Sequence, residues 1–293
     1  MTFSLIPTTP PSLLERLHLA ANVTITSLER RVMRRQRTHV LICGFPRSGT
    51  SLLFNMMAAT LPGYRRDEFE RYAPNRLHRL GNYITKAPMD VFHVRELDKL
   101  NINRKKLAIL VVVRDVRDVL SSRHPLIPDE FFIGFDHSWW PNRTTPEGWS
   151  YSAPGIVDIF DEMFRIRERS DVMFVRYEDL VLEPGTVQAH VADRFSLPFT
   201  GSFAQYDRIT TNHPYLYKGR HKARDEALAL EGKPLTTTRV QRWRTDQRIR
   251  NRVRSQFERC SRLFEPLEFF SYESSRTWFD ALCASSSELS ETS

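Results

Sequence analysis

Apolar and polar positions follow one another in blocks along this chain and predict an ordered series of strands and helices. Short, nearly continuous apolar runs are typical of buried strands, whereas apolar residues spaced three and four apart indicate amphipathic helices. The pattern predicts strands at residues 38–44, 82–86, 106–113 and 171–176, and helices at 12–35, 49–60, 88–98, 115–123, 154–169 and 184–194. This alternation favours an α/β fold, a parallel β-sheet with helices on both faces.

The length of 293 residues suits one substantial α/β core, because such folds commonly exceed the mean domain length. We expect an N-terminal helical extension over residues 1–36, the main domain over 37–284 and a disordered tail over 285–293. Beyond residue 235, two arginine-rich helical patterns precede a short helix around Trp278.

The most informative motif, FPRSGTS, follows the first predicted strand. Gly44 and Gly49 have the four-residue gap of a Walker loop, but Thr50 stands where the Walker lysine would be. The glycines let the backbone turn and approach a ligand, Pro46 stiffens the loop, and the next helix adds its positive dipole end. The cation is Arg47, whose fork suits phosphate or sulfuryl oxygens. The loop favours a short anion bound without metal, although a purely structural glycine turn would look the same.

A second element strengthens the prediction of an anion site. An apolar run beginning at Leu107 ends at Arg114, and Ser122 follows eight residues later. With Arg114 at the end of a strand and Ser122 two turns into the following helix, both would face the crevice beyond the carboxyl ends of parallel strands. Open α/β sheets bind their ligands in this crevice. One anion could then contact both side chains.

These motifs resemble the sulfotransferase superfamily that uses 3′-phosphoadenosine 5′-phosphosulfate (PAPS). The resemblance rests on five segments in family order, which are FPRSGTS, ITKAPMD, the Arg114 to Ser122 element, MFVRYEDLVLEP and TTRVQRWR. It implies a P-loop-like α/β fold and an enzyme that moves a sulfuryl group to a hydroxyl or amine, releasing 3′-phosphoadenosine 5′-phosphate (PAP). No metal is implied. The match is closer to bacterial and carbohydrate-type members than to those acting on phenols and steroids.

The resemblance also implies roles for individual residues. Six loop residues would hold the 5′-phosphosulfate, namely Pro46, Arg47, Ser48, Gly49, Thr50 and Ser51. Arg47 and Lys86 would act on the sulfuryl group. The 3′-phosphate would meet Arg114 and Ser122, with Tyr177 near the adenine. Three residues of the late segment would close over the 3′-phosphate end, namely Thr238, Arg239 and Trp243.

The chain departs from the family pattern at the catalytic base. Phenol and steroid members carry Lys-Thr-His after the second strand, whereas this chain has Lys86, Ala87 and Pro88, and proline cannot accept a proton. Carbohydrate-type and several bacterial members use a glutamate shortly after the loop helix, where this chain offers Glu68 and Glu70. Alternation puts both on one face of an extended segment. We place Glu68 first and Glu70 second.

Other interpretations of these acidic residues stay open. Each glutamate could simply pair with Arg65, Arg66 or Arg71 in a solvated loop. His93 and His137 are further candidate bases, although an isolated histidine is more often a packed or surface residue.

The adenine contacts follow the family less closely. A tryptophan often stacks on adenine five residues after the loop cation, and this chain has Leu52 there.

Two long loops, residues 125–154 and 206–234, interrupt the alternation. The first is rich in aromatic residues, which argue against disorder, and long loops in compact domains are often lids. We expect it to bind the acceptor through Phe132, Phe135, His137, Trp139 and Trp140. A small core that covers a sheet edge or a dimer contact is the alternative. The second loop contains KGRHKAR and could close on the cofactor or on an anionic acceptor.

Composition limits the possible binding partners and the cellular compartment. The net charge of +8 could attract an anionic cofactor and substrate, although a basic surface is most often a solvated helix face. No nucleic-acid module is evident, so we expect no nucleic-acid partner. The three cysteines have neither metal-ligand nor disulfide spacing. No apolar run reaches the roughly 20 residues of a membrane span, and the first residues do not form a signal peptide. We therefore expect a cytoplasmic enzyme with a small-molecule or carbohydrate acceptor.

Two other function classes compete with this interpretation. A small-molecule or nucleotide kinase would use a related loop, but the loop lysine and a second metal-binding acid are missing. A scaffold protein would bind the nucleotide without catalysis. The sequence leaves the identity of the acceptor and the oligomeric state open.

Overall fold

The computed structural model describes residues 13–32, 36–67, 70–123, 133–141, 149–208 and 235–287. The chain divides into two compact units. The first unit contains Met1–Gly44, Gly49–Val112 and Glu162–Leu235, and the second contains Phe45–Ser48, Val113–Asp161 and Thr236–Ser293.

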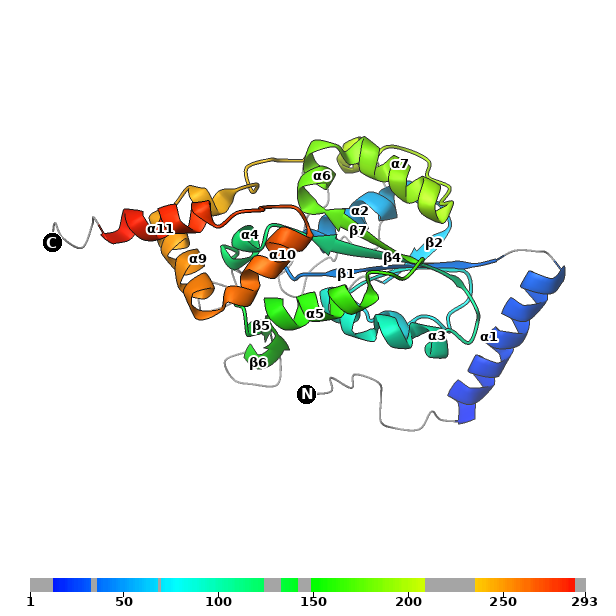
Figure 1. Cartoon of the computed structure of the whole chain (residues 1–293). Coiled ribbons are helices and arrows are strands. Elements are labelled where there is room, and N and C mark those ends of the chain that lie inside the picture. The colour runs from blue at the N-terminus through cyan, green and yellow to red at the C-terminus, as the bar shows by residue number, and fades with distance from the viewer. Residues whose placement is uncertain are drawn as a thin grey trace. The chain divides into compact units, whose positions relative to one another are not determined.

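The first unit is built on a five-stranded sheet with the order β2-β3-β1-β4-β7 (Figure 1). Its strands are β1 (Thr38–Gly44), β2 (Tyr64–Arg66), β3 (Asn82–Lys86), β4 (Lys106–Val113) and β7 (Val172–Arg176). The pairs β2–β3, β3–β1 and β1–β4 are parallel, and their register aligns one residue from each of four strands, namely Arg65, Tyr83, His39 and Leu107. All seven residues of β1 are buried, as expected for a parallel strand covered on both faces.

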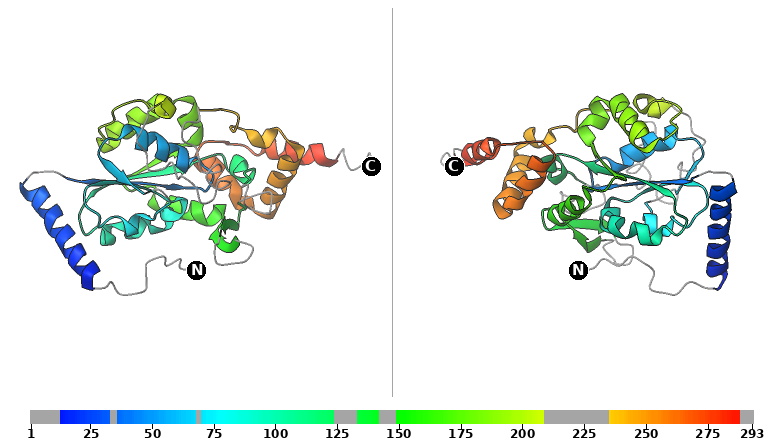
Figure 2. Two further views of the ribbon diagram at one scale, coloured as in Figure 1. Left: turned by 180° about the vertical axis from the view of Figure 1, so that it is seen from behind. Right: turned by 45° about the vertical axis from the view of Figure 1, so that its right-hand side comes forward.

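Helices cover both faces of this sheet (Figures 1 and 2). One face packs against α2 (Thr50–Thr60), α6 (Tyr177–Leu182) and α7 (Pro184–Phe195), and the other faces η2 (Pro88–Glu96) and α3 (Leu97–Leu100). The core on the α2 face joins side chains such as Val40, Ile42, Leu110 and Met57. Alternate residues of β1 point to the opposite face. The first unit also holds α1 (Leu13–Val32), η1 (Ala73–Asn75) and η3 (Phe203–Arg208).

The second unit contains short helices and one antiparallel hairpin. Its elements are α4 (Val116–Leu120), β5 (His137–Pro141), β6 (Trp149–Pro154), η4 (Arg242–Arg244), α9 (Gln247–Arg259), η5 (Ser261–Leu263), α10 (Phe264–Phe269) and α11 (Thr277–Ser287). The sequence boundary between Asp161 of the second unit and Glu162 of the first falls within helix α5 (Ile156–Ile166). Aromatic rings hold the late helices together, because Phe257 packs edge-on against Phe264 and Trp278.

The α/β fold with a parallel sheet is confirmed, and three of the four predicted strands have the expected bounds. The helix predicted over 115–123 is wrong at its end, because α4 stops at Leu120 and Ser122 lies beyond it. The hydroxyls of Ser121 and Ser122 donate to the carbonyl oxygen of Asp118, and such local hydrogen bonds compete with helix continuation.

Other differences concern short elements. The segment predicted as a helix over 88–98 is a 3₁₀-helix, η2, for most of its length. Strand β2, helix α6 and the β5–β6 hairpin are too short for hydrophobic periodicity to reveal. Helix α11 runs to Ser287, so residues 285–287 of the predicted tail are helical, and residues 288–293 lie outside the described part.

Candidate functional site

The loop between β1 and α2 requires glycine at both of its ends. Gly44 has φ +136°, and a Cβ there would overlap the backbone of Val112. Gly49 has φ +99°, and its Cβ would lie 2.5 Å from Cδ2 of Tyr177. Only glycine combines this backbone conformation with so close an approach. Tyr177, expected near the adenine, is buried with its ring against the loop at Gly49.

The N-terminus of α2 has features that favour binding of an anion. Gly49 is the N-cap and supplies no side-chain hydrogen bond, and the first turn has no acidic residue. The Nζ of Lys86, at the end of β3, donates to Oγ of Ser51 at 3.0 Å. A cation at a helix N-terminus opposes the helix dipole, so this arrangement is favourable only when an anion joins it.

A carboxylate completes this group. Oε1 of Glu70 lies 2.6 Å from Nζ of Lys86, whose side chain is 12% exposed, while that of Glu70 is 41% exposed. The backbone N–H of Arg71 donates to the Lys86 carbonyl at 3.2 Å and holds this segment beside the end of β3. Glu68 lies outside the described residues. Among the described residues, the carboxylate that the structure brings to Lys86 is therefore that of Glu70.

A buried polar network lies behind Glu70. The carboxylate of Asp90 is fully buried and accepts hydrogen bonds from the N–H of Ala73 at 2.8 Å and from Nδ1 of His93 at 3.0 Å. Burial raises the pKa of Asp90. Tyr72 packs edge-on against the His93 ring, and burial, aided by Asp90 and Glu70, raises the pKa of Tyr72 to about 12. His93, a candidate base, is buried in this network.

Within the second unit, Arg114 organises three backbone segments. Its guanidinium donates to the carbonyl of Arg47 at 3.2 Å and to the carbonyl of Arg239, and it pairs with Asp118 at 3.4 Å. The side chain of Arg47 donates to the carbonyl of Arg123 at 3.3 Å. The structure thus brings the loop cation, Arg114 and the late segment together.

Asp118 anchors the late segment to this arginine. Its carboxylate accepts from the N–H of Gln241 at 2.8 Å and from the N–H of Trp243 at 3.1 Å. Burial raises the pKa of Asp118, and the charge of Arg114 opposes that shift. The hydroxyl of Ser122 donates to the backbone carbonyl of Asp118 at 3.2 Å, so Arg114 and Ser122 both contact this residue.

The remaining residues of the late segment differ in exposure. Trp243 is buried, with the guanidinium of Arg117 4.5 Å from its ring centroid and Trp278 packed edge-on. Thr238 and Arg239 are exposed. The Trp243 ring therefore belongs to the core of the second unit.

The expected acceptor residues are only partly described. Phe132 lies outside the described residues, and so do the side chains of Trp139 and Trp140, whose backbones form part of β5. The guanidinium of Arg259 lies 5.0 Å from the ring centroid of Phe135. Nδ1 of His137 lies 2.7 Å from the carboxylate of Asp136.

Asp90 and Asp118 were not identified as site residues from the sequence, because the hydrogen-bond partners of a carboxylate are known only from the folded structure. A signal exists for Asp118, which follows Arg114 by four residues, the spacing of a helical ion pair.

No group of three or more His, Cys, Asp or Glu side chains in the described ranges could hold a metal ion. Among the helices described, none has the length and apolar character needed to cross a membrane.

A comparison with known protein families gives a match. The family model of the sulfotransferase domain matches residues 37–223, which is more than half of the chain. A search of curated proteins found no match.

Proposed function

The chain belongs to the sulfotransferase domain family, and from this premise we propose that it moves a sulfuryl group from PAPS to a hydroxyl or amine of its acceptor. One observation carries the proposal. The ammonium of Lys86 stands at the uncapped start of α2, bonded to Ser51, with the carboxylate of Glu70 beside it. Sulfuryl transfer is helped by a site for the anionic donor, by a cation that stabilises the charge on the transferred group, and by a base that takes the acceptor proton.

The chemistry of the loop fits the donor. The backbone N–H groups at the start of α2 and the hydroxyls of Thr50 and Ser51 are donors for a phosphosulfate group. Arg47 supplies a fork that matches terminal oxygens. The late segment is tied to Arg114 through Asp118, and this contact supports a role for Arg114 at the 3′-phosphate. Ser122 remains a candidate for the same phosphate.

In the proposed reaction, Glu70 accepts the proton of the acceptor hydroxyl while the acceptor oxygen forms a bond to sulfur. The bond between sulfur and the bridging oxygen breaks, and PAP leaves with the electron pair. Lys86 and Arg47 stabilise the negative charge that develops on the bridging and sulfuryl oxygens. Glu70 is favoured over Glu68 because Glu70 has the contact with Lys86 at 2.6 Å. No proposed step requires a metal.

The acceptor and the setting are also part of the proposal. The segment 125–154 binds the acceptor as an aromatic lid, with Phe135 and His137 among its contacts, and the acceptor is a small molecule or a carbohydrate. The three cysteines, Cys43, Cys260 and Cys283, are free, and this supports a reducing compartment such as the cytoplasm.

Two experiments test the function. Calorimetry with PAP, and separately with ATP and Mg²⁺, determines which nucleotide binds. A screen for transfer of labelled sulfate from PAPS across phenols, sugars, amines and lipid alcohols then identifies the acceptor class. We expect binding of PAP without metal and transfer to at least one class. A preference for ATP with Mg²⁺ would establish the kinase alternative, and PAP binding with no transfer to any acceptor would establish the scaffold alternative.

A further inference from the structure

Lys105 is a buried lysine that the proposed reaction does not use. It is 4% exposed, and its Nζ makes no hydrogen bond or ion pair with any of the described residues. The ring centroid of Tyr83 lies 5.8 Å from Nζ. A cation–π contact at this distance is close to the limit of about 6 Å at which such contacts count. The ammonium therefore lacks the partner that a buried charge requires.

The sheet register gathers other cations on the same face. Arg65, Tyr83, His39 and Leu107 form one row across β2, β3, β1 and β4. Lys105 precedes Leu107 by two residues, so alternation puts it on the face that this row occupies. Arg37 stands in the same relation to His39, and the N–H of Lys106 donates to the Arg37 carbonyl at 2.8 Å. The cluster lies where these strands begin, at the opposite end from the loop at Gly44.

The charges in this cluster have one sign. Burial, together with the charges of Arg37 and Arg65, lowers the pKa of Lys105 to about 8. Burial, with the charge of Lys105, lowers the pKa of His39. Burial, with the charges of Arg79, Arg76 and Lys105, lowers the pKa of His78, so the neutral forms of both are favoured. The nearby carboxylate of Asp67 is bound instead to Arg76 and to the hydroxyl of Tyr83.

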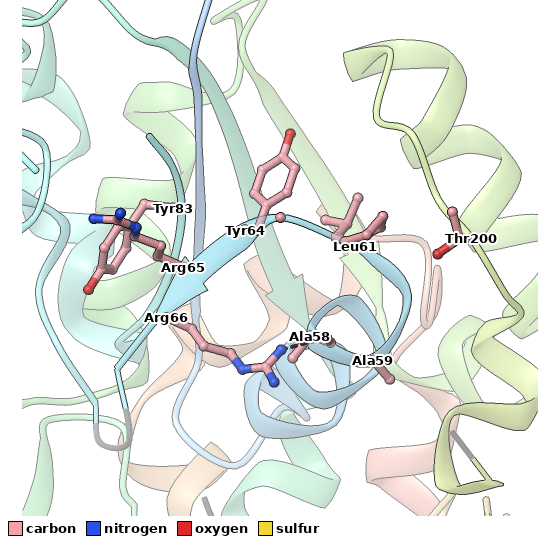
Figure 3. A pocket seen from close by; sticks show the side chains of 10 residues that line it. Ala58, Ala59, Leu61, Tyr64, Arg65, Arg66, Tyr83 and Thr200 are labelled. Atoms are coloured by element: carbon pink, nitrogen blue, oxygen red, sulfur yellow. Dashed lines mark hydrogen bonds between the residues drawn. The ribbon is translucent and has the colours of Figure 1, made fainter. Parts of the chain in front are cut away.

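Arg65 is a member of this cluster that reaches solvent. It is exposed, and with Tyr83 it lines a groove of about 530 Å³ that runs past Pro62 and Tyr64. Figure 3 shows Arg65 beside Tyr83 on one side of β2, whereas Arg66 points to the other side, where it donates to the carbonyl of Ala58 at 2.5 Å. Tyr83 thus lines the groove and also has the Nζ of Lys105 5.8 Å from its ring centroid.

We propose that Lys105 and Arg65 form a second anion site, which takes a small tetrahedral oxyanion, either free sulfate or phosphate or the end of an organic monoester. Lys105 supplies the buried charge and Arg65 supplies the fork that closes over the oxyanion. The groove gives room for the organic part of an ester. This site is separate from the loop and does not depend on the proposed function.

Nuclear magnetic resonance of lysine side chains in the full chain tests the proposal directly. The Lys105 signal is the one missing from K105R. Titration with sodium sulfate or phosphate should move this signal saturably, and the pKa read from it should rise toward the ordinary lysine value. Chloride at equal ionic strength should leave it in place. If sulfate and phosphate move the signal no more than chloride does, the site does not exist.

Variants separate this site from the loop. R65Q should weaken sulfate binding by about tenfold, because one charge-assisted interaction is lost. K99Q removes a positive charge from an exposed position on α3 and should bind sulfate like the wild type. K105M should abolish sulfate binding in calorimetry while PAP affinity is unchanged. Equal sulfate affinity in R65Q and K99Q would overturn the role of Arg65.

A third titration distinguishes the two sources of the oxyanion. Phenyl phosphate that binds at least as tightly as inorganic phosphate would identify the end of an organic ester as the ligand. Weaker binding of phenyl phosphate would identify the free anion. Either result supports the shared chemistry, provided that R65Q weakens the same titration.

Discussion

Nζ of Lys86 lies 2.6 Å from the carboxylate of Glu70 and 3.0 Å from the hydroxyl of Ser51. This contact links the end of β3 to the first turn of α2 and to the segment that follows β2. The lysine holds the carboxylate next to the place where the loop favours an anion. If the carboxylate takes the acceptor proton, its contact with Lys86 sets the distance between base and sulfuryl group.

Replacement of Glu70 tests this relationship. E70Q keeps the shape of the side chain and removes its ability to accept a proton, so we expect turnover to fall by about 10²–10⁴-fold. Affinity for PAP should change little, because the carboxylate is not part of the phosphate contacts. Initial rates with the acceptor from the screen, together with calorimetry, measure the two effects.

E68Q is the matched control for this prediction. It makes the same chemical change two residues away, and we expect turnover close to that of the wild type. A large loss in E68Q with normal turnover in E70Q would transfer the role of base to Glu68. Normal turnover in both variants would mean that neither glutamate is the base.

We expect Arg114 to bind the 3′-phosphate of PAP. R114K keeps a positive charge next to the buried Asp118 but loses the guanidinium fork. We expect PAP to bind about tenfold more weakly to R114K, while 5′-AMP, which lacks the 3′-phosphate, binds with unchanged affinity. Calorimetry with both nucleotides measures the difference. An equal loss for PAP and 5′-AMP would show that Arg114 only supports the fold through Arg47 and Arg239.

The core of this fold could be predicted from the sequence because its strands are buried on both faces. A strand such as Thr38–Gly44 is then a continuous apolar run with clear ends. The loop was also predictable, since Gly44 and Gly49 are required by backbone geometry that local sequence determines. Strand β2 was not, because three residues at a sheet edge carry no periodicity.

The candidate site was less predictable than the fold. The pairing of Lys86 with Glu70 joins residues 16 positions apart, and periodicity could not separate Glu70 from Glu68. Asp118 bonds to Gln241 and Trp243, more than 120 residues away, and no local pattern indicates such a contact. The position of Ser122 was missed because its own hydroxyl bonds to Asp118 where the helix ends.

The loop glycine next to Tyr177 should be sensitive to a single methyl group. G49A places a Cβ 2.5 Å from Cδ2 of Tyr177 and forces alanine into φ +99°. We expect it to lower the free energy of unfolding by about 3 kcal/mol, as the sum of backbone strain and overpacking. Urea denaturation of the full chain measures this loss.

Gly63 is the matched control for Gly49. It has φ +76°, and nothing lies within 4 Å of the position of its Cβ. G63A should therefore cost only the backbone strain, about 1 kcal/mol. If G49A and G63A cost the same, the Tyr177 ring moves aside freely and does not support the loop.

Lys105 should make the stability of the wild type depend on pH. Its pKa is about 8 in the folded chain and about 10.4 in the unfolded chain, so between these values the unfolded chain binds more protons. Stability therefore rises with pH through this window, and the penalty of the buried charge is fully present below pH 8. Between pH 7.5 and 9.5 we expect a gain of about 2 kcal/mol that K105M lacks. K105M, which removes the unpaired charge and keeps most of the apolar stem, should also be more stable than the wild type at pH 7.5.

Urea denaturation in chloride buffer at several pH values measures this dependence. The difference between the wild type and K105M cancels the other groups that titrate, such as Tyr72 and Tyr206, whose pKa values burial raises to about 12. Added sulfate should flatten the dependence, because an oxyanion at Lys105 keeps the ammonium charged in the folded chain. Parallel pH curves for the wild type and K105M would mean that Lys105 stays protonated on folding, and the buried ammonium would then need no anion.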